Sequence, residues 1–317
     1  MSSPPAIAWC DPSQSAGQAA RRIHWALLRV IEANLEGARA GLDPEFLHDL
    51  RVATRRTRSA LGQIRAVFPA PEVTHFKAEF AWLQQVTGPT RDLDVHLRAL
   101  NDYRTLLSPE LRADVLLLKT FLARHREATQ AAMIRELDSA RLHGLLADWR
   151  AFLEAPRSTA AAGCKAACPV REVANVCLRR LHRRVLEEGR AITVTAPSEA
   201  LHELRKSCKK LRYLLEFFQG LYPPGQVPRM LKQLKELLDH LGGLQDLVVQ
   251  MRVLRKMGNQ MLEEGVGGAW GTVLADLEGR WRTERERFVR VFARFDCAYE
   301  RRLFKDLLRS GWASGVR

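Results

Sequence analysis

The sequence has no apolar run that approaches the roughly 20 residues needed to cross a bilayer. Its first residues, 1–9, lack the basic stretch followed by an apolar one that marks a secretory signal. Strand patterns are equally scarce, because only residues 191–195 look β-like and that segment is too short to build a sheet. We therefore expect neither a membrane span nor a secreted β protein, but a cytoplasmic one.

Cysteines are few and do not have the paired spacing of a disulfide framework. Among the six, Cys164 and Cys168 lie near each other, but no histidine supports them as metal ligands. Reduced thiols are usual for the cytosol. We expect no metal and no cofactor.

Acidic residues are outnumbered, with 36 Asp and Glu against 50 Lys and Arg and a formal charge of +14. Such a surplus resists compaction unless it is spread out or neutralised by a partner. Hydrophobic residues make up 46% of the 317 positions, enough for a buried core. Nucleic acid, anionic lipid and phosphate polymers are thus the first partner classes to weigh.

Nearly all the remaining sequence has helical periodicity. The predicted helices cover residues 14–40, 44–68, 73–87, 91–107, 109–140, 142–153, 171–190, 198–221, 226–241, 244–264 and 268–310. Gly88-Pro89 and Gly242-Gly243 are among the predicted breaks. The Ala-, Ser- and Gly-rich residues 156–169 resemble a flexible linker. We therefore predict a disordered or loosely attached N-terminus over 1–14 and two helical halves over 15–155 and 170–317.

The two halves repeat each other. His48-Asp49-Leu50-Arg51 matches His202-Glu203-Leu204-Arg205 at an offset of 202 − 48 = 154. Asp92-Leu93 matches Asp246-Leu247 at the same offset, since 246 − 92 = 154. One offset over so long a stretch indicates duplication of a helical unit. Short breaks favour antiparallel neighbours, so we predict an all-α fold of two pseudo-symmetric four-helix bundles.

Each repeated helix has one basic face. The first basic row comprises His48, Arg51, Arg55 and Arg58, with Arg56 at its flank. The second basic row comprises His202, Arg205, Lys209 and Arg212, with Lys206 and Lys210 at its flank. At 1.5 Å rise per residue the first row extends roughly 15 Å. No acidic residue interleaves on that face, so the cations repel one another unless an anion occupies the row. Arginine forks match phosphate oxygens in pairs, and lysine supplies a mobile charge.

Further basic residues are expected to extend the site. They are Arg21, Arg22, Arg179, Arg180, Arg183, Lys232 and Lys235. Three carboxylates, Asp92, Asp94 and Asp246, follow glycine-containing turns and open helices. A carboxylate there favours the helix macrodipole or pairs with an arginine, so we expect these three to be structural.

His48 and His202 are expected to be neutral, because neighbouring cations lower the pKa of an imidazole. A neutral ring still donates one hydrogen bond to a phosphate. Asp49 points about 100° away from His48 on a helix, so the pair does not form the metal site of a phosphohydrolase. We predict no catalytic residue and no metal ligand.

These motifs resemble the CHAD family, the conserved histidine α-helical domain. The resemblance is carried by His48-x-x-Arg51-Val52-x-x-Arg55-Arg56-x-Arg58, by His202-x-x-Arg205-Lys206-x-x-Lys209-x-x-Arg212-Tyr213 and by the turns around Gly88 and Gly242. It covers residues 15–309. It implies two bundles related by a pseudo-twofold axis around a central basic channel, with inorganic polyphosphate as ligand and association with polyphosphate granules.

The chain departs from the family pattern at two positions and lacks one associated motif. Val248 replaces the acid found at Asp94, and Gln245 stands where Arg91 stands, which leaves the second half less firmly held. Some members are fused to a triphosphatase with a Glu-x-Glu-x-Lys motif. That motif is absent here, so the fused activity is not implied.

Three functions follow in order. The first is non-catalytic polyphosphate binding in the cytoplasm, on granules. The second is nucleic-acid binding, which is less favoured because neither basic row carries an aromatic side chain for stacking. The third is a metal-dependent phosphohydrolase, for which the sequence offers no clear ligand set or proton-transfer pair.

Overall fold

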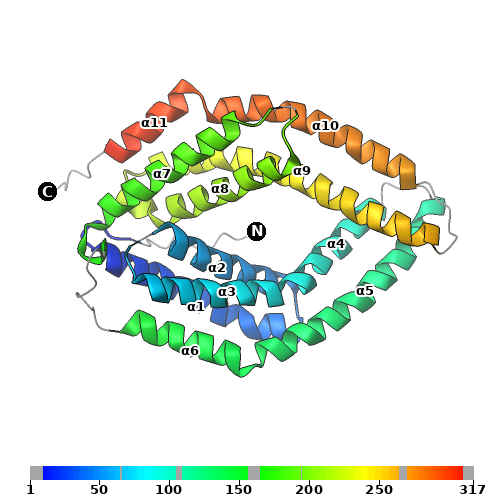
Figure 1. The fold of residues 1–317 in the computed structure, drawn as a ribbon, viewed down its shortest axis with the longest axis horizontal. Helices are drawn as coiled ribbons and strands as arrows, with labels where there is room; N and C mark the ends of the chain where they lie inside the picture. Colours follow the sequence, from blue (N-terminus) through cyan, green and yellow to red (C-terminus); the bar gives the residue numbers. More distant parts are fainter. Residues whose placement is uncertain are drawn as a thin grey trace. The chain divides into compact units, whose positions relative to one another are not determined.

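The fold is all-helical throughout the part of the chain that the structure describes. The structure is a computed structural model that describes residues 10–64, 66–104, 109–155, 165–193, 195–263 and 270–309. These residues form eleven α-helices and two short 3-10 helices, without a named strand (Figure 1). The predicted all-α class is confirmed. None of the helices described is both long and apolar enough to cross a membrane.

The chain divides into two compact units. The N-terminal unit is Ser13–Val170, and the C-terminal unit is Arg171–Arg317 together with the start of the chain. The N-terminal unit contains α1 (Ala16–Ala40), α2 (Pro44–Gln63), α3 (Ala70–Val86), α4 (Gly88–Arg104), α5 (Pro109–Leu137), α6 (Ala140–Glu154) and η1 (Lys165–Ala167). The C-terminal unit contains α7 (Val170–Arg190, of which Val170 belongs to the other unit), α8 (Ser198–Phe217), η2 (Gln219–Leu221), α9 (Gln226–Glu263), α10 (Trp270–Phe295) and α11 (Ala298–Arg309).

Aromatic packing fills the core of the N-terminal unit. Trp149 of α6 is fully buried, and its ring centre lies 4.5 Å from that of Phe76 and 5.5 Å from that of Phe80, both on α3. Such pairs add to the stabilisation that area burial gives. Gly37 lets α1 approach α2, because a Cβ there would overlap the ring of Phe46.

Local sequence explains the start of α2, the helix that carries the first basic row. Asp43 is its N-cap, and a side-chain oxygen of Asp43 accepts a hydrogen bond of 2.8 Å from the backbone N–H of Glu45. Pro44 occupies the first helical position, where its missing N–H costs nothing. Gly41 ends α1 with a φ of 64°, which glycine adopts without strain.

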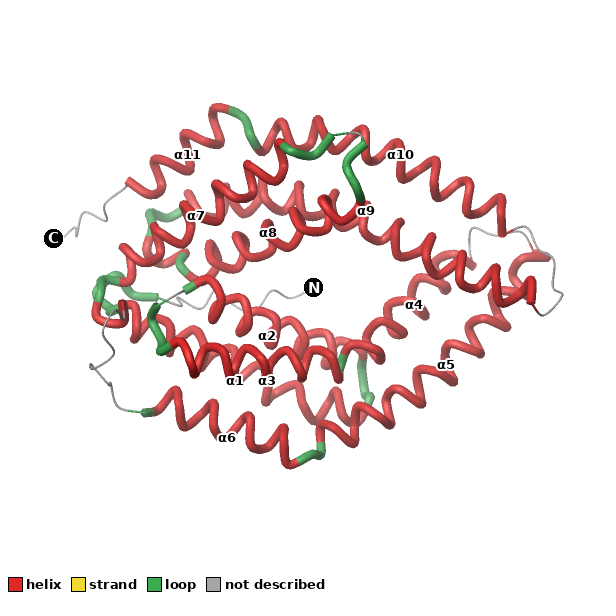
Figure 2. Tube along the Cα trace, in the orientation of Figure 1, coloured by secondary structure: helices red, strands yellow, loops and turns green. Residues whose placement is uncertain are grey.

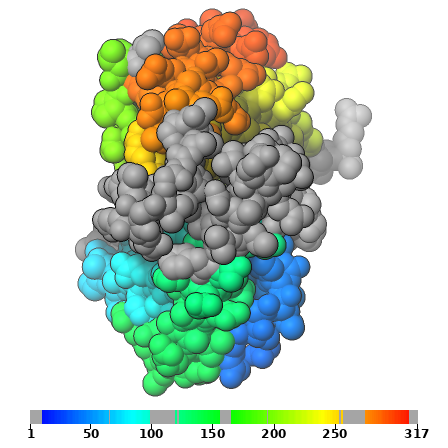
Figure 3. Space-filling model, turned by 90° about the vertical axis from the view of Figure 1, so that its right-hand side faces the viewer, coloured from blue at the N-terminus to red at the C-terminus, as the bar shows by residue number. Residues whose placement is uncertain are grey.

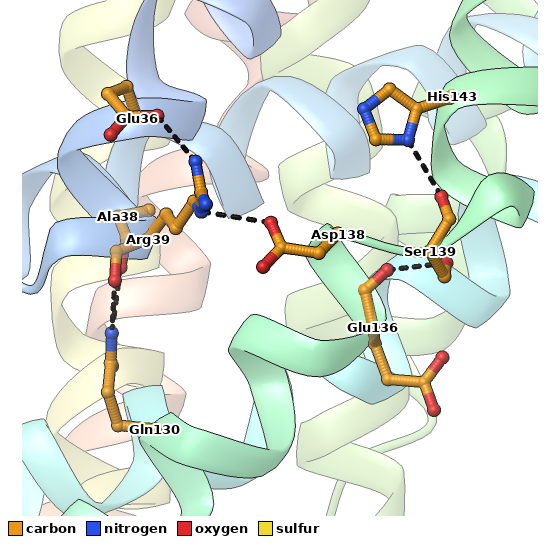
Figure 4. A network of polar contacts seen from close by, with 8 residues as sticks. All are labelled: Glu36, Ala38, Arg39, Gln130, Glu136, Asp138, Ser139 and His143. Carbon is orange, nitrogen blue, oxygen red and sulfur yellow. Dashed lines mark hydrogen bonds and ion pairs between the residues drawn. The ribbon is translucent and has the colours of Figure 1, made fainter.

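Polar contacts join the end of α1 to the end of α5 (Figure 4). Arg39 pairs with Asp138 at 2.9 Å and with Glu36 at 3.3 Å. Gln130 donates hydrogen bonds of 3.0 Å to the carbonyl oxygens of Ala38 and Arg39, which would otherwise lack partners at the helix end. These contacts fix the connection that leads into α2.

The predicted break at Gly242-Gly243 is wrong, because α9 continues through both glycines (Figure 2). In the N-terminal unit the matching position to Gly243 is Pro89, since 243 − 154 = 89. Proline has no N–H to continue the helical ladder, and only Thr87 separates α3 from α4. Gly243 keeps its N–H, and glycine costs only about 1 kcal/mol relative to alanine in a helix.

The predicted single helix over 268–310 is also wrong. It is divided into α10 and α11 by a turn at Asp296 and Cys297, visible as a loop in Figure 2. Asp296 accepts hydrogen bonds of 2.7 and 2.9 Å from Arg190 at the end of α7. That ion pair fixes the turn and lowers the pKa of Asp296. In a space-filling view α10 and α9 lie against each other (Figure 3).

Both ends of the predicted linker and N-terminus differ in part from expectation. Residues 1–9 and 156–164 lie outside the described residues. Cys10 is buried in the C-terminal unit, where its carbonyl oxygen lies close to Gly220. Ala16 donates a backbone hydrogen bond of 2.8 Å to Cys168, so residues 165–169 pack onto the start of α1. The five cysteines in the described part of the chain are free thiols.

One buried histidine lies in each unit, on α1 and on α7. His24 is 1% exposed, with its ring centre 5.1 Å from that of Trp149, and burial lowers its pKa to about 3. His182 stacks on Phe304 with ring centres 3.8 Å apart, and burial lowers its pKa to about 4. Both rings are therefore neutral in the folded protein at neutral pH.

We expect the protein to lose stability as the pH falls below about 6.5. In the unfolded chain both histidines bind a proton near the ordinary pKa of 6.5, whereas in the fold they do so only near 3 and 4. Stability therefore rises with pH across this window, by up to about 1.4 kcal/mol per pH unit for each histidine. The free energy of unfolding, measured by denaturation between pH 7 and pH 5, tests this.

The variant His182→Phe should remove one histidine's share, about 2 kcal/mol between pH 7 and pH 5. His75 is exposed, so His75→Gln is the control and should leave the pH dependence unchanged. A pH slope that is equally steep in His182→Phe would contradict the assignment.

Candidate functional site

The first basic row lies on the side of α2 that is not buried in the core. The opposite side of the helix is buried, at Leu47, Leu50, Ala53, Thr54, Thr57, Ala60 and Leu61. Thr54 and Thr57 satisfy their hydroxyls within the helix, by donating to the carbonyl oxygens of Leu50 and Ala53. All five residues of the row, His48, Arg51, Arg55, Arg56 and Arg58, are partly exposed. The predicted separation of an apolar face from a basic face is therefore present.

Arg51 ties α2 to the end of α3. Its Nη1 donates hydrogen bonds of 2.7 Å to the carbonyl oxygen of Gln84 and 2.9 Å to the hydroxyl of Thr87. In return the side-chain amide of Gln84 donates a 2.7 Å hydrogen bond to the carbonyl oxygen of Arg51. Burial lowers the pKa of Arg51, as does the charge of Arg55, while Asp92 raises it. Arg51 thus helps to hold the row in place, in addition to its predicted ligand role.

Arg91 determines which nitrogen of His48 carries the proton. Its Nη2 lies 3.0 Å from His48 Nδ1, and its Nη1 donates a 3.3 Å hydrogen bond to the carbonyl oxygen of Pro44. A guanidinium can only donate, so Nδ1 must accept and the ring proton is on Nε2. Burial lowers the pKa of His48, and the charge of Arg91 lowers it further. His48 is therefore a neutral ring with one N–H, on Nε2, available for an anion.

Arg55 and Arg58 carry the uncompensated charge of the first row. Within the part of the chain that the structure describes, neither forms an ion pair with a carboxylate. Burial lowers the pKa of Arg58, and the like charge of Arg55 lowers it as well. Two cations three residues apart on a helix lie side by side and repel each other. An oxyanion bound between them would remove that repulsion.

The second basic row is partly neutralised, contrary to the expectation that no acid lies on this face. Lys206 pairs with Glu203 at 2.7 Å, and Arg212 pairs with Glu216 at 2.7 Å. Both acids lie three or four residues from their partners, on neighbouring positions of the same helix surface. Exposed pairs of this type contribute less than about 1 kcal/mol, so an anion of higher charge can displace them.

Other cations of the second row are close to one another. Burial lowers the pKa of Lys210, and the charges of Lys206 and Arg184 lower it further. Burial raises the pKa of Asp246, which the charges of Arg205 and Lys209 oppose. Asp246 therefore faces the second row, as Asp92 faces Arg51 in the first.

His202 has a different partner from His48. Its Nδ1 lies 3.0 Å from the side-chain oxygen of Gln245, and Gln245 occupies the position of Arg91, since 245 − 154 = 91. An amide oxygen accepts a hydrogen bond, so this contact permits a proton on Nδ1, which Arg91 does not permit on His48. The two equivalent histidines are therefore held in different hydrogen-bonding states.

Several residues that were expected to extend the site have other contacts. Arg21 donates two 2.7 Å hydrogen bonds to the carbonyl oxygens of Phe152 and Leu153, so it caps the end of α6 and is a structural residue. Arg183 pairs with Glu187 at 3.4 Å and Lys235 with Asp239 at 2.6 Å. The remaining members lie on the surface or partly buried, at Arg22, Arg179, Arg180 and Lys232.

The expectation for Asp94 is met with a specific partner. Asp94 is buried and forms a 3.0 Å ion pair with Arg126 of α5. Arg126 lies outside every sequence motif singled out, so its role could not be read from the pattern. Arg91 and Arg184 were likewise not assigned to the site, although Arg91 directly follows the Gly88 turn at a fixed distance from the first row.

Metal ligands are not grouped in the described part of the chain. No cluster of three or more His, Cys, Asp or Glu side chains there could hold a metal ion. The chemistry that the rows offer is charge pairing by guanidinium and ammonium groups together with an N–H donor from His48.

Replacing Arg91 with glutamine should raise the pKa of His48. The variant removes a positive charge and introduces the amide found beside His202, while burial, Glu45, Asp49 and Arg55 continue to act on the ring. Histidine NMR titration, with His48→Gln to assign the signal, measures the shift. Arg29→Gln, an exposed change on α1, is the control. An unchanged pKa in Arg91→Gln would contradict the proposed tautomer.

Comparisons with known proteins agree with the motifs. The family model for the CHAD domain matches residues 22–255. The crystal structure of the CHAD domain from the plant Ricinus communis is 28% identical, with a TM-score of 0.69 over 87% of this chain and 93% of that one. PptA from Streptomyces chartreusis is 15% identical, with a TM-score of 0.69 over 89% and 99%, a likeness of fold alone. No curated protein matches the sequence.

Proposed function

Because this chain belongs to the CHAD domain family, which is linked to polyphosphate binding in general, we propose that it binds inorganic polyphosphate without cleaving it. The binding residues are the first and second basic rows. We place the protein in the cytoplasm, on polyphosphate granules. Each of these statements goes beyond family membership and rests on the arguments that follow.

The observation that carries the proposal is the uncompensated charge on α2. Arg55 and Arg58 are adjacent, partly buried and without a carboxylate partner in the described residues. His48 adds an N–H on Nε2 because Arg91 occupies its other nitrogen. A polymer with one negative charge per phosphate supplies many oxyanions along a line, which suits a row of cations roughly 15 Å long.

The duplication explains why one polymer would engage both rows. The family resemblance implies that the two rows line one basic channel, and we adopt that arrangement as part of the proposal. Two weak rows acting on one chain give an affinity above that of either, because the second contact is intramolecular. Loss of one row should then weaken binding, and loss of both should abolish it.

Removing Arg55 and Arg58 should reduce polyphosphate affinity at least tenfold. These two residues are a sharper choice than Arg51, which also holds α3. The double variant Arg55→Gln/Arg58→Gln should also flatten the salt dependence, because each lost ion pair lowers the slope of log K against log salt by about 0.7 to 0.9. Titration with long-chain polyphosphate at several salt concentrations measures both effects.

The matched control is Arg29→Gln/Arg135→Gln. It removes the same charge from exposed positions of the same unit, on α1 and α5. Its affinity and salt slope should equal those of the unaltered protein. Equal losses in the two double variants would mean that net charge, and not the first row, governs binding.

Polyphosphate should keep its chain length when it is incubated with the protein and Mg²⁺ or Mn²⁺. Gel electrophoresis of the polymer and an assay for released phosphate follow the reaction over time. Phosphate release that disappears in His48→Gln or His202→Gln would replace the binding proposal with a hydrolase.

A further inference from the structure

The C-terminal unit contains a cavity that uses no residue of either basic row. Its volume is about 670 Å³, within the range typical of small-molecule sites. It lies between the start of α8, the second half of α9 and the middle of α10. The side chains that matter for its chemistry are Val248, Met251, Arg252, Trp281, Arg282 and Arg285.

Arg285 brings a buried positive charge to this cavity. It is 7% exposed, and its Nη2 donates to the carbonyl oxygens of Thr193 and Ala196 in the connection before α8. No carboxylate pairs with it in the described residues, and its Nε has no hydrogen-bond partner there. Taking a charge out of water costs several kcal/mol unless a counter-charge is supplied. The fold itself does not supply one.

The N-terminal unit shows what is missing. There Arg126 of α5 reaches the connection between α1 and α2 at Gly41 and pairs with Asp94 of α4 at 3.0 Å. Position 94 corresponds to Val248, since 94 + 154 = 248, and Val248 lines the cavity. One half thus has an internal carboxylate for its buried arginine, and the other half has an apolar side chain and an open cavity.

Two more cations line the same cavity. Arg252 and Arg282 are exposed and form no ion pair within the described part of the chain. Arg255 is neutralised by Glu278 at 2.6 Å, and one further acid, Glu199, lies at the cavity. Three arginines therefore face one unpaired carboxylate, which leaves the cavity positive.

The start of α8 adds backbone donors. Its N-cap is Pro197, which makes no side-chain hydrogen bond to the first turn. The first N–H groups of an uncapped helix lack partners and favour an oxyanion. Ser198 does not replace the cap, because its hydroxyl donates a 3.2 Å hydrogen bond to Glu199.

An apolar wall distinguishes this cavity from the basic rows. Trp281 is partly buried and packs with Val248 against the core cluster that contains Met251. Its indole N–H has no partner in the described residues, and the guanidinium of Arg285 lies 4.8 Å from the ring centre. A chain of phosphates alone has nothing to pack on an indole, whereas a nucleobase stacks on one.

We propose that this cavity binds a nucleoside phosphate. Its phosphates pair with Arg252, Arg282 and Arg285 and with the N–H groups at the start of α8, and its base packs on Trp281. This site is separate from the proposed polyphosphate function and does not depend on it.

Calorimetric titration with ATP, adenosine and tripolyphosphate tests the proposal on the full chain. ATP should bind more tightly than either other probe, since it alone satisfies the cations and the indole. Arg252→Gln/Arg282→Gln should weaken ATP binding at least tenfold, and both positions are exposed, so the fold should be unaffected. Arg290→Gln, exposed on the same helix and outside the cavity, should bind ATP as the unaltered chain does.

A second variant supplies the missing carboxylate. Val248→Asp places at 248 the acid that Asp94 provides in the other half, and it should weaken ATP binding with retained circular dichroism. The row variant Arg55→Gln/Arg58→Gln should keep full ATP affinity while it loses polyphosphate. Tripolyphosphate binding as tight as ATP, no ATP binding at all, or ATP loss in the row variant would each overturn the proposal.

Discussion

Like charges can be kept in one row only if the helix that carries them is held firmly against its neighbours. On α2 the holding forces are an apolar face that is fully buried and the reciprocal hydrogen bonds between Arg51 and Gln84. The first anchors the helix by burial, and the second fixes its end against α3. Arg55 and Arg58 are consequently presented at fixed positions although they repel each other.

The same constraint accounts for the state of His48. A cation beside an imidazole makes a second positive charge costly, so Arg91 keeps the ring neutral and directs its single proton to Nε2. In the other half, Gln245 is neutral and accepts from His202. The repeat has thus preserved the position of the histidine while its hydrogen-bond partner has changed.

Divergence between the halves follows a consistent pattern. The N-terminal unit neutralises its buried Arg126 with Asp94, whereas the C-terminal unit has Val248 at the matching position and leaves Arg285 without an acid in the described residues. Conversely, the second basic row has gained internal partners at Glu203 and Glu216. The first half therefore has the stronger uncompensated row, and the second half has the uncompensated cavity.

Much of this could be predicted from the sequence, because periodicity and the 154-residue offset are properties of the sequence alone. The helical class, the two-faced character of α2 and the structural role of Asp94 are of this kind. Three-dimensional partners were not predictable. Arg126, Arg184 and the capping role of Arg21 depend on which side chains meet across helices, and no spacing along the chain specifies that.

Helix boundaries failed for a related reason. The sequence marks Gly88-Pro89 and Gly242-Gly243 as equal breaks, but only proline removes the N–H that the helix needs. The turn at Asp296 depends on an ion pair with Arg190, 106 residues away in the chain. Local propensity was overridden by tertiary contact in that case.

The central claim is that fixed rows of cations select a polymer of phosphates without bases. Competition between long-chain polyphosphate and single- or double-stranded DNA, at equal phosphate concentration and one salt concentration, tests it most directly. The account predicts that polyphosphate displaces both nucleic acids from the protein and that this preference is lost in Arg55→Gln/Arg58→Gln. Preferential retention of DNA by the unaltered protein would contradict it.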